Sequence, residues 1–273
     1  MTTSGMEIKM IEIIYLGTCS GTEPREGMHH CSWVMRIGGV NYWFDAGENC
    51  SYSAHLGGID ILATRALFVS HPHIDHIGGL ANLLAVMRKL VHIGEGTVGD
   101  DNSLEVLFPD LEVFDAVKTV LCGMAKNRSL NFIINERAIS DGVIFEDENI
   151  RVTALHNDHL KGREGFEPGH SFSFLIEAEG KRIVYSGDIK RTVELDGLKP
   201  EGADLLIIET GHNLVEDVLS YAASREIKHL RFNHHGREIL EDREGCEKKV
   251  RDFSKERGID ALICFDGMKE TLS

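Results

Sequence analysis

The segment with the greatest capacity for chemistry is SHPHIDHIGGL, residues 70–80. Within six positions it holds four potential metal ligands: His71, His73, Asp75 and His76. An apolar run leads into it and a helical pattern follows. Zinc and similar borderline metals accept imidazole nitrogens and carboxylate oxygens as ligands. If the chain turns here from strand to helix, the first two histidines and the later Asp-His pair form two ligand sets facing one cavity. The segment therefore predicts a site for two metals side by side.

The pattern His-x-His-x-Asp-His, followed by Ile-Gly-Gly-Leu, resembles the signature of the metallo-β-lactamase superfamily of metal-dependent hydrolases. Polar residues at later strand ends match further positions of this superfamily, so the resemblance covers nearly the whole chain. It implies two metal sites and one bridging carboxylate: His71, His73 and His159 for the first ion, Asp75, His76 and His234 for the second, and Asp188 between them.

The resemblance also implies a supporting residue. Asp45 ends the strand predicted over residues 40–44 and matches an aspartate that supports the histidine loop from behind. Residues in this position orient the metal ligands.

Two of the implied ligands have competitors nearby. His159 competes with His156 and His170 in the same polar stretch. Strand alternation puts His156 at the last in-register position, where it can be a surface residue. His234 competes with His235, and we prefer His234 because the superfamily pattern reaches its ligand two residues after the last apolar strand position.

The resemblance implies hydrolysis by a metal-bound hydroxide. Two ions about 3.5–4 Å apart lower the pKa of bound water to about 7 and offset the negative charge that develops on the substrate. Asp75 could accept the hydroxide proton, and His212 or His235 could protonate the leaving group. We expect two divalent ions, with zinc as the default, although manganese and iron accept the same ligands.

Net charge limits the choice of substrate. The 273 residues carry a formal charge of −15, which repels polyanions unless basic residues cluster. We therefore expect a small-molecule ester rather than nucleic acid. The leading class is a small phosphodiester, such as a cyclic nucleotide or a sugar phosphate. Lys161, Arg163 and Arg237 lie close in sequence to implied ligands and are candidate phosphate contacts. A lactone, thioester or other carboxylic ester is the alternative, because it uses the same chemistry.

The turn at residues 17–18 and the segment 266–268 look like the branch that contains ribonuclease Z and the cyclic phosphodiesterases. Processing of transfer RNA 3′ ends is a weaker alternative, since the sequence departs from that enzyme. The loop 161–170 is too short for the arm that grips transfer RNA, and Ile208 stands where a histidine is expected. The segment after His234 also lacks the usual serine-containing loop. A non-catalytic metal-binding protein is a further alternative, against which the complete ligand set argues.

The predicted elements form two β-rich blocks, each flanked by helices, which predicts an α/β fold: a four-layer αββα sandwich with the site along one edge of its sheets. Gly38-Gly39 predicts a hairpin between strands 32–37 and 40–44. Helices are predicted over residues 52–64, 80–90, 110–124, 214–225 and 238–255. We expect one domain over residues 1–273, with 1–10 as a short disordered lead.

The remaining composition indicates a cytoplasmic protein. The six cysteines are scattered without a Cys-x-x-Cys pair, which is typical of free thiols in a reducing compartment. There is no apolar run of about 18 residues, so no membrane span is expected. The N-terminus lacks the charged and apolar regions of a signal peptide.

Overall fold

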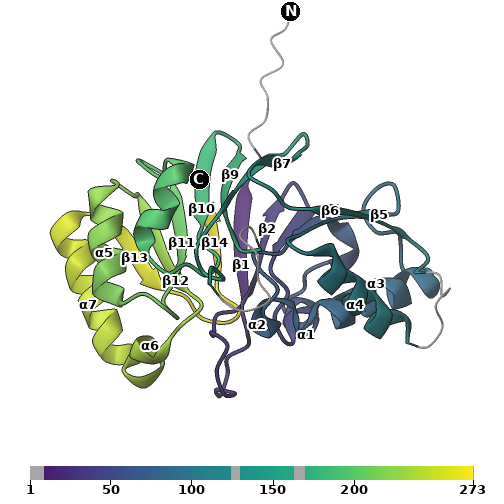
Figure 1. The fold of residues 1–273 in the computed structure, drawn as a ribbon, viewed down its shortest axis with the longest axis horizontal. Helices are drawn as coiled ribbons and strands as arrows, with labels where there is room; N and C mark the ends of the chain where they lie inside the picture. The colour runs from purple at the N-terminus through teal and green to yellow at the C-terminus, as the bar shows by residue number, and fades with distance from the viewer. Residues whose placement is uncertain (1–8, 124–129, 163–169, 273) are drawn as a thin grey trace, which may run out of the picture.

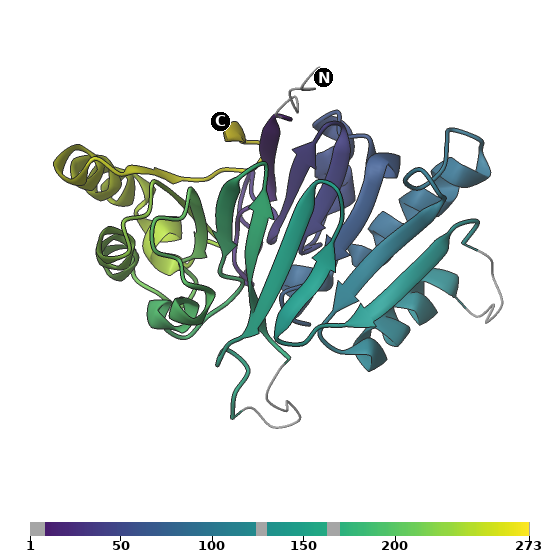
Figure 2. The ribbon, with the colours of Figure 1, turned by 90° about the horizontal axis from the view of Figure 1, so that it is seen from above.

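The computed structural model describes residues 9–123, 130–162 and 170–272. Two seven-stranded mixed sheets pack face to face, and helices cover both outer faces (Figures 1 and 2). This arrangement confirms the predicted αββα sandwich. The first eight residues of the predicted disordered lead lie outside the described residues, as does Arg163. The assignment of the chain to a single domain stays a prediction.

The first sheet has the strand order β14-β1-β2-β3-β4-β5-β6. β14, β1, β2 and β3 pair antiparallel, and β3 to β6 pair parallel. Its strands are β1 (Ile11–Gly17), β2 (Ser32–Ile37), β3 (Val40–Phe44), β4 (Thr64–Phe68), β5 (Ser103–Phe108), β6 (Ile133–Ala138) and β14 (Lys269–Leu272).

The second sheet has the order β13-β12-β11-β10-β9-β8-β7 and repeats this plan, with parallel pairing from β13 to β10 and antiparallel pairing from β10 to β7. Its strands are β7 (Gly142–Glu146), β8 (Ile150–His156), β9 (Phe172–Ala178), β10 (Lys181–Tyr185), β11 (Leu205–Glu209), β12 (His229–Asn233) and β13 (Asp260–Ile263).

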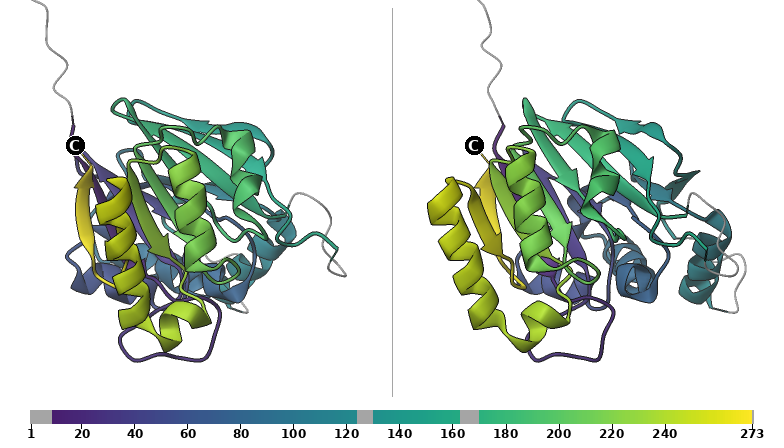
Figure 3. Two further views of the ribbon diagram at one scale, coloured as in Figure 1. Left: turned by 90° about the vertical axis from the view of Figure 1, so that its left-hand side faces the viewer. Right: turned by 60° about the vertical axis from the view of Figure 1, so that its left-hand side comes forward.

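The longer helices cover the outer faces, and Figure 3 shows α5 and α7 in front of the second sheet. The α-helices are α1 (Cys50–Leu56), α2 (Ile74–Ile77), α3 (Leu80–His92), α4 (Leu111–Cys122), α5 (Val215–Ser224), α6 (Arg237–Glu241) and α7 (Arg243–Arg257), with 3-10 turns η1 (Ile61–Ala63) and η2 (Thr192–Leu198). Within the described ranges, no helix is long and apolar enough to cross a membrane. All six cysteines are free thiols.

Aromatic side chains fill the space between the sheets. Trp33 stacks on Phe44 with ring centroids 4.2 Å apart, and Phe44 stacks on Phe68 at 4.9 Å. Phe174 and Tyr185 enter the same cluster from the second sheet. Burial of these large rings supplies a major part of the folding free energy. It also fixes how the two sheets face each other, and so how their edges meet.

The predicted hairpin is present, and Gly38 and Gly39 both have positive φ, as a type I′ turn requires.

Two predicted helix boundaries were wrong for local reasons. The helix predicted over 52–64 ends at Leu56, because two glycines follow it. The helix predicted over 238–255 is broken at Asp242, whose carboxylate accepts from the Gly245 N–H at 3.0 Å and caps α7.

Candidate metal centre

The histidine loop turns from β4 into the short helix α2, as the sequence predicts. His73 is the residue before the helix and has an extended backbone, φ −65° and ψ 150°. His71 and His73 therefore precede the helix, while Asp75 and His76 lie in its first turn. His71, Asp75 and His76 are buried, and His73 is half-buried.

Four residues from three loops bring their ligand atoms together in a first cluster: His71, His73, His159 and Asp188. His73 Nδ1 lies 2.9 Å from His71 Nε2 and 3.2 Å from His159 Nε2. Asp188 Oδ2 lies 3.7 Å from the Nε2 atoms of both His71 and His159. Ligand atoms about 2.0–2.1 Å from a tetrahedral zinc ion are about 3.3–3.4 Å apart. These separations fit four ligands around one ion.

A second cluster lies on the other side of Asp188 and contains Asp75, His76 and His234. Asp188 Oδ1 is 3.3 Å from the Nε2 atoms of both His76 and His234. Asp75 Oδ2 is 3.1 Å from His234 Nε2 and 3.5 Å from His76 Nε2. The two carboxylate oxygens of Asp188 thus face different clusters, which is the geometry of a bridging ligand.

Two buried atoms that face the second cluster form no hydrogen bond. Among the described residues, His76 Nε2 and Asp188 Oδ1 are fully buried without a hydrogen bond, although they lie 3.3 Å apart. Buried polar atoms in native proteins are satisfied in nearly every case. Their aim at the same point as His234 Nε2 fits a cation held at that position.

Burial and neighbouring charges set the protonation of the cluster. The carboxylate pKa of Asp188 is well below its usual value, because attraction to the surrounding histidines outweighs the burial that raises it. The pKa of Asp75 is lowered in the same way, mainly by the hydrogen bond from His234. Burial lowers the pKa of His71. Two neighbouring carboxylates raise the pKa of His76 well above its usual value in spite of its burial. Ionised carboxylates and neutral imidazoles are the forms that bind metals, so His76 must release a proton when an ion binds.

Asp45 supports both clusters from behind. Its buried carboxylate accepts from the Ser70 N–H at 2.7 Å, the Ser70 hydroxyl at 2.8 Å and the Tyr185 hydroxyl at 2.6 Å, and lies 2.8 Å from His76 Nδ1. The Ser70 oxygen, having donated to Asp45, accepts from His71 Nδ1 at 3.1 Å. These bonds direct the Nε2 atoms of His71 and His76 toward the clusters.

Sequence reasoning missed Ser70 and Tyr185. Ser70 is the first residue of the histidine segment, and Tyr185 ends β10 just before Ser186-Gly187-Asp188. Their positions were visible in the sequence, but no sequence signal tells that both hydroxyls meet at Asp45. That meeting depends on the packing of one sheet against the other.

The structure separates the competing histidines. His159 enters the first cluster because Asn157 holds the turn after β8, accepting from the His159 N–H at 3.1 Å. The His156 ring is about half exposed and lies 2.7 Å from Asp141. Among the described residues, His170 belongs to neither cluster.

The structure also separates His234 from His235. His234 has positive φ, 47°, and its ring enters the second cluster. His235 points away: its Nε2 donates to the Cys264 carbonyl at 2.8 Å, and burial lowers its pKa to about 3. The predicted acid role of His235 does not fit this placement, because the ring is neutral and its Nε2–H is directed to a buried carbonyl outside the clusters.

His212 fits the role of leaving-group acid better. Its ring lies at the mouth of the centre, 37% exposed, with Nδ1 3.8 Å from Asp188 Oδ2. Its ring centroid is 4.8 Å from that of His159. The buried Glu209 carboxylate, which sequence reasoning missed as a contributor, lies 3.4 Å from the same Nδ1 and accepts from the His212 N–H. This carboxylate is placed to hold the orientation of the His212 ring.

The candidate phosphate contacts are already paired. Lys161 bonds Asp158 at 3.2 Å and is exposed. Arg237 lies 3.2 Å from Glu23 and is exposed as well. Both cations would have to leave a carboxylate to bind a substrate. Arg163 lies outside the described residues.

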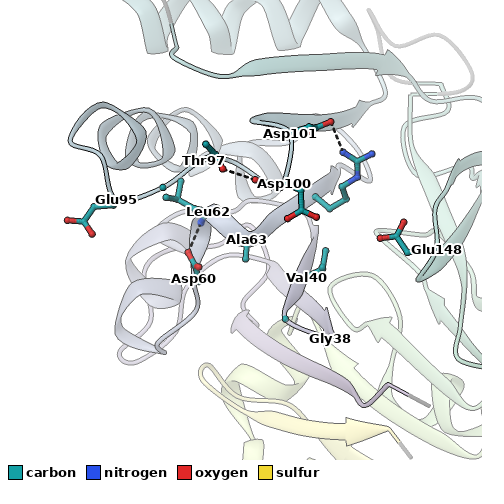
Figure 4. Close-up of a pocket in the computed structure, with 14 residues that line it drawn as sticks. Gly38, Val40, Asp60, Leu62, Ala63, Glu95, Thr97, Asp100, Asp101 and Glu148 are labelled. Atoms are coloured by element: carbon teal, nitrogen blue, oxygen red, sulfur yellow. Dashed lines mark hydrogen bonds and ion pairs between the residues drawn. The ribbon is translucent and has the colours of Figure 1, made fainter. Parts of the chain in front are cut away.

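A separate cavity lies at the opposite edge of the first sheet (Figure 4). Its volume is about 590 Å³, and its lining includes the Gly38-Gly39 hairpin at the far end of β2 and β3 from the clusters. The lining is rich in carboxylates, among them Asp60, Asp100 and Glu148. This hollow contains none of the clustered ligands, so it is not the metal centre.

The fold and the paired His/Asp clusters define a metal-dependent hydrolase of the metallo-β-lactamase superfamily, in the ribonuclease Z-like branch. The chain binds divalent metal. Within that class, it belongs to the family described as Anti-Pycsar protein Apyc1, whose profile matches residues 11–208. His234 and the strands β12, β13 and β14 follow the matched region.

Individual relatives agree with this assignment. The chain is 24% identical over 280 residues to Ribonuclease Z of Methanothermobacter thermautotrophicus, covering 82% of this chain and 86% of the relative. Its fold is similar to the metallo-beta-lactamase fold protein YhfI of Bacillus subtilis, with a TM-score of 0.73, 17% identity and coverage of 96% and 99%. It is also similar to the short form of human tRNase Z, with a TM-score of 0.70, 19% identity and the same coverage. Two of these names denote ribonucleases, which runs against the expectation that nucleic acid is not a partner.

Proposed function

We propose that the chain hydrolyses a small phosphodiester at a centre of two divalent ions, zinc by default. His71, His73 and His159 would hold one ion, and Asp75, His76 and His234 the other, with Asp188 shared. The observation that carries the proposal is the division of Asp188: one carboxylate oxygen faces each cluster, at 3.7 Å and 3.3 Å from the nearest histidine nitrogens. When bound, two such ions lower the pKa of water and offset charge on phosphoryl oxygens.

The chain's own residues supply the proton transfers. Asp75 is ionised, and its Oδ2 lies at the centre of the second cluster, where it can accept a proton from the attacking water. His212 lies at the mouth and can protonate the departing oxygen, with the Glu209 carboxylate 3.4 Å from its Nδ1. Most of the clustered ligands are buried, which strengthens each of these charge interactions.

Two other ester classes use the same centre. RNA is favoured by the name of the relative that covers 82% of this chain, and opposed by the charge of −15, because binding a polyanion requires a basic surface. Carboxylic esters, including lactones and thioesters, remain the alternative among small molecules. We also propose that the chain works in the cytoplasm, which does not affect the choice between these substrate classes.

The test is hydrolysis of bis(p-nitrophenyl) phosphate by protein reconstituted with zinc or manganese. We expect turnover that falls at least about 100-fold in Asp75→Ala, the scale of a general base. Asp252→Ala, which removes an exposed carboxylate on α7, is the matched control and should retain full activity.

Parallel assays with a lactone, a thioester and a transfer RNA precursor decide among the substrate classes. No turnover of the phosphodiester, with two metals still bound, would overturn the phosphodiester proposal. In a phosphodiesterase, His212→Ala should lower turnover and leave metal content unchanged; full activity in that variant would remove the acid role from His212.

A further inference from the structure

A second cavity, of about 480 Å³, adjoins the metal centre. It lies between the loop that follows Asp188, the loop that follows β11, and helix α5. Lys190 and Arg191 line it from the first loop, His212 and Asn213 from the second, and Tyr221 and Ser224 from the helix. Its volume is within the range of small-ligand sites.

His212 connects this cavity to the clusters. It is part of the cavity wall, and its Nδ1 lies 3.8 Å from the Oδ2 of Asp188. Lys190 follows Asp188 by only two residues. A molecule with one end at the metal centre can therefore extend past His212 and place its other end beside Lys190.

The walls of the cavity are held in place before any ligand binds. Asn213 Nδ2 donates to the Ile189 carbonyl at 3.2 Å and to the Glu209 carboxylate, which ties the two loops together. Tyr221 donates its hydroxyl to Asp196 at 2.9 Å. A preformed cavity spends little free energy on ordering when a ligand binds.

Lys190 differs from the other cations around the centre. Lys161, Arg191 and Arg237 each lie within 4 Å of a carboxylate. The Lys190 ammonium instead donates to the neutral Lys161 carbonyl at 2.8 Å, and within the described part of the chain it makes no ion pair. A carbonyl leaves the full positive charge available. On a chain of net charge −15, such an uncompensated cation beside the centre favours an anionic ligand. One carboxylate, Asp217, also lines the cavity, so the preference depends on contact with Lys190 itself.

We infer that this cavity binds the half of the substrate that is not at the metals, and that Lys190 pairs with a second anionic group carried there. The inference rests on the proposed function and makes it narrower: the substrate class becomes a phosphodiester with a further phosphate or carboxylate. Lys190 is a specificity-determining residue in this arrangement, and the reaction itself takes place at the metal centre.

Calorimetry on the zinc-loaded protein tests this without turnover, using thymidine 3′,5′-bisphosphate and thymidine 5′-monophosphate as probes. One phosphate of either probe occupies the metal centre, and only the bisphosphate reaches Lys190. We expect the bisphosphate to bind about tenfold more tightly, the scale of one charge-assisted hydrogen bond. Lys190→Gln should abolish that advantage and leave monophosphate affinity within twofold.

Lys248→Gln, on the exposed face of α7, removes the same charge far from the cavity and should keep the tenfold advantage. Equal affinity for both probes in the unmodified protein, or an advantage that survives Lys190→Gln, overturns the inference. Bis(p-nitrophenyl) phosphate has no second anionic group, so its hydrolysis does not involve Lys190. Failure of that hydrolysis would therefore count against the proposed function alone, while the difference in affinity between the two probes tests the role of the cavity.

Discussion

Replacing Ser70 with alanine should weaken one metal site more than the other. The Ser70 hydroxyl is fully buried, donates to Asp45 and accepts from His71 Nδ1, and its oxygen also lies 3.3 Å from His76 Nδ1. Alanine removes both bonds and leaves the His71 N–H without a partner. Asp45 keeps its bonds from the Ser70 N–H and Tyr185 and its contact with His76 at 2.8 Å. The support of His76, and so of the second cluster, persists.

The magnitude follows from those contacts. Two hydrogen bonds contribute about 1 kcal/mol each, and an unsatisfied buried donor costs about 1–3 kcal/mol. Loss of a residue that orients a ligand lowers metal affinity by about 10–100-fold, or about 1.4–2.8 kcal/mol. We expect this loss at the first cluster, with a change below about threefold at the second.

The assay is a two-site zinc titration against a competing chelator, followed by the melting temperature of the apo-protein. Ser51→Ala removes another buried hydroxyl, one that accepts from Asn82 away from the clusters, and should leave both affinities unchanged. Asp45→Asn should weaken both sites. Equal weakening of the two sites in Ser70→Ala, or none, would refute the reasoning that Ser70 supports His71 more than His76, which keeps its shorter contact with Asp45.

Three further predictions concern the same fold. Removing metal with a chelator should lower the melting temperature by about 5–10 °C, because ligand present at about 100 times its Kd stabilises by about 2.7 kcal/mol; an unchanged melting curve would show that the clusters are not metal sites. Gly211→Ala places a methyl group 2.8 Å from the His234 ring, so zinc affinity at the second cluster should fall. Gly180→Ala has open space but a positive φ of 74°, so it should lower stability and leave metal affinity unchanged. Asp196 has a lowered pKa, chiefly because the Arg225 guanidinium bonds it. As pH falls, Asp196 is therefore protonated in the unfolded protein before it is protonated in the folded protein. The stability that Asp196 contributes is present above its usual pKa of 3.8 and lost as pH falls through the lower folded value. In urea unfolding, the difference in unfolding free energy between Asp196→Asn and the unmodified protein should be smaller at pH 3 than at pH 5, and a constant difference would contradict this.

Patterns of neighbouring residues in the sequence determined much of the secondary structure of this protein. The histidine loop, the hairpin at Gly38-Gly39 and most strands follow from hydrophobic periodicity and turn chemistry, which act over a few neighbouring residues. The two β-rich blocks, each flanked by helices, predicted the αββα sandwich, and the resemblance carried by the loop indicated the superfamily. The paired ligands of α2 also follow locally, because a strand followed at once by a helix presents both sets in one turn.

Strand β14 was not predicted from the sequence. Its residues, Lys269 to Leu272, are mainly polar, and they form a strand because β1 offers an open edge to pair with. The early end of one predicted helix and the break in another lie between local and tertiary control. The glycine after Leu56 and the capping side chain of Asp242 are local signals, but tertiary packing decides whether a helix ends at such a signal.

Only the tertiary structure decided which histidines meet at the centre. His156 and His159 are three residues apart, and the turn held by Asn157 sends one outward and the other into the first cluster. His234 and His235 are adjacent, and a backbone turn of positive φ points their rings in opposite directions. Sequence states which side chains are present. Their distances depend on how two sheets pack through an aromatic core, and that packing sums contacts between residues far apart in the chain.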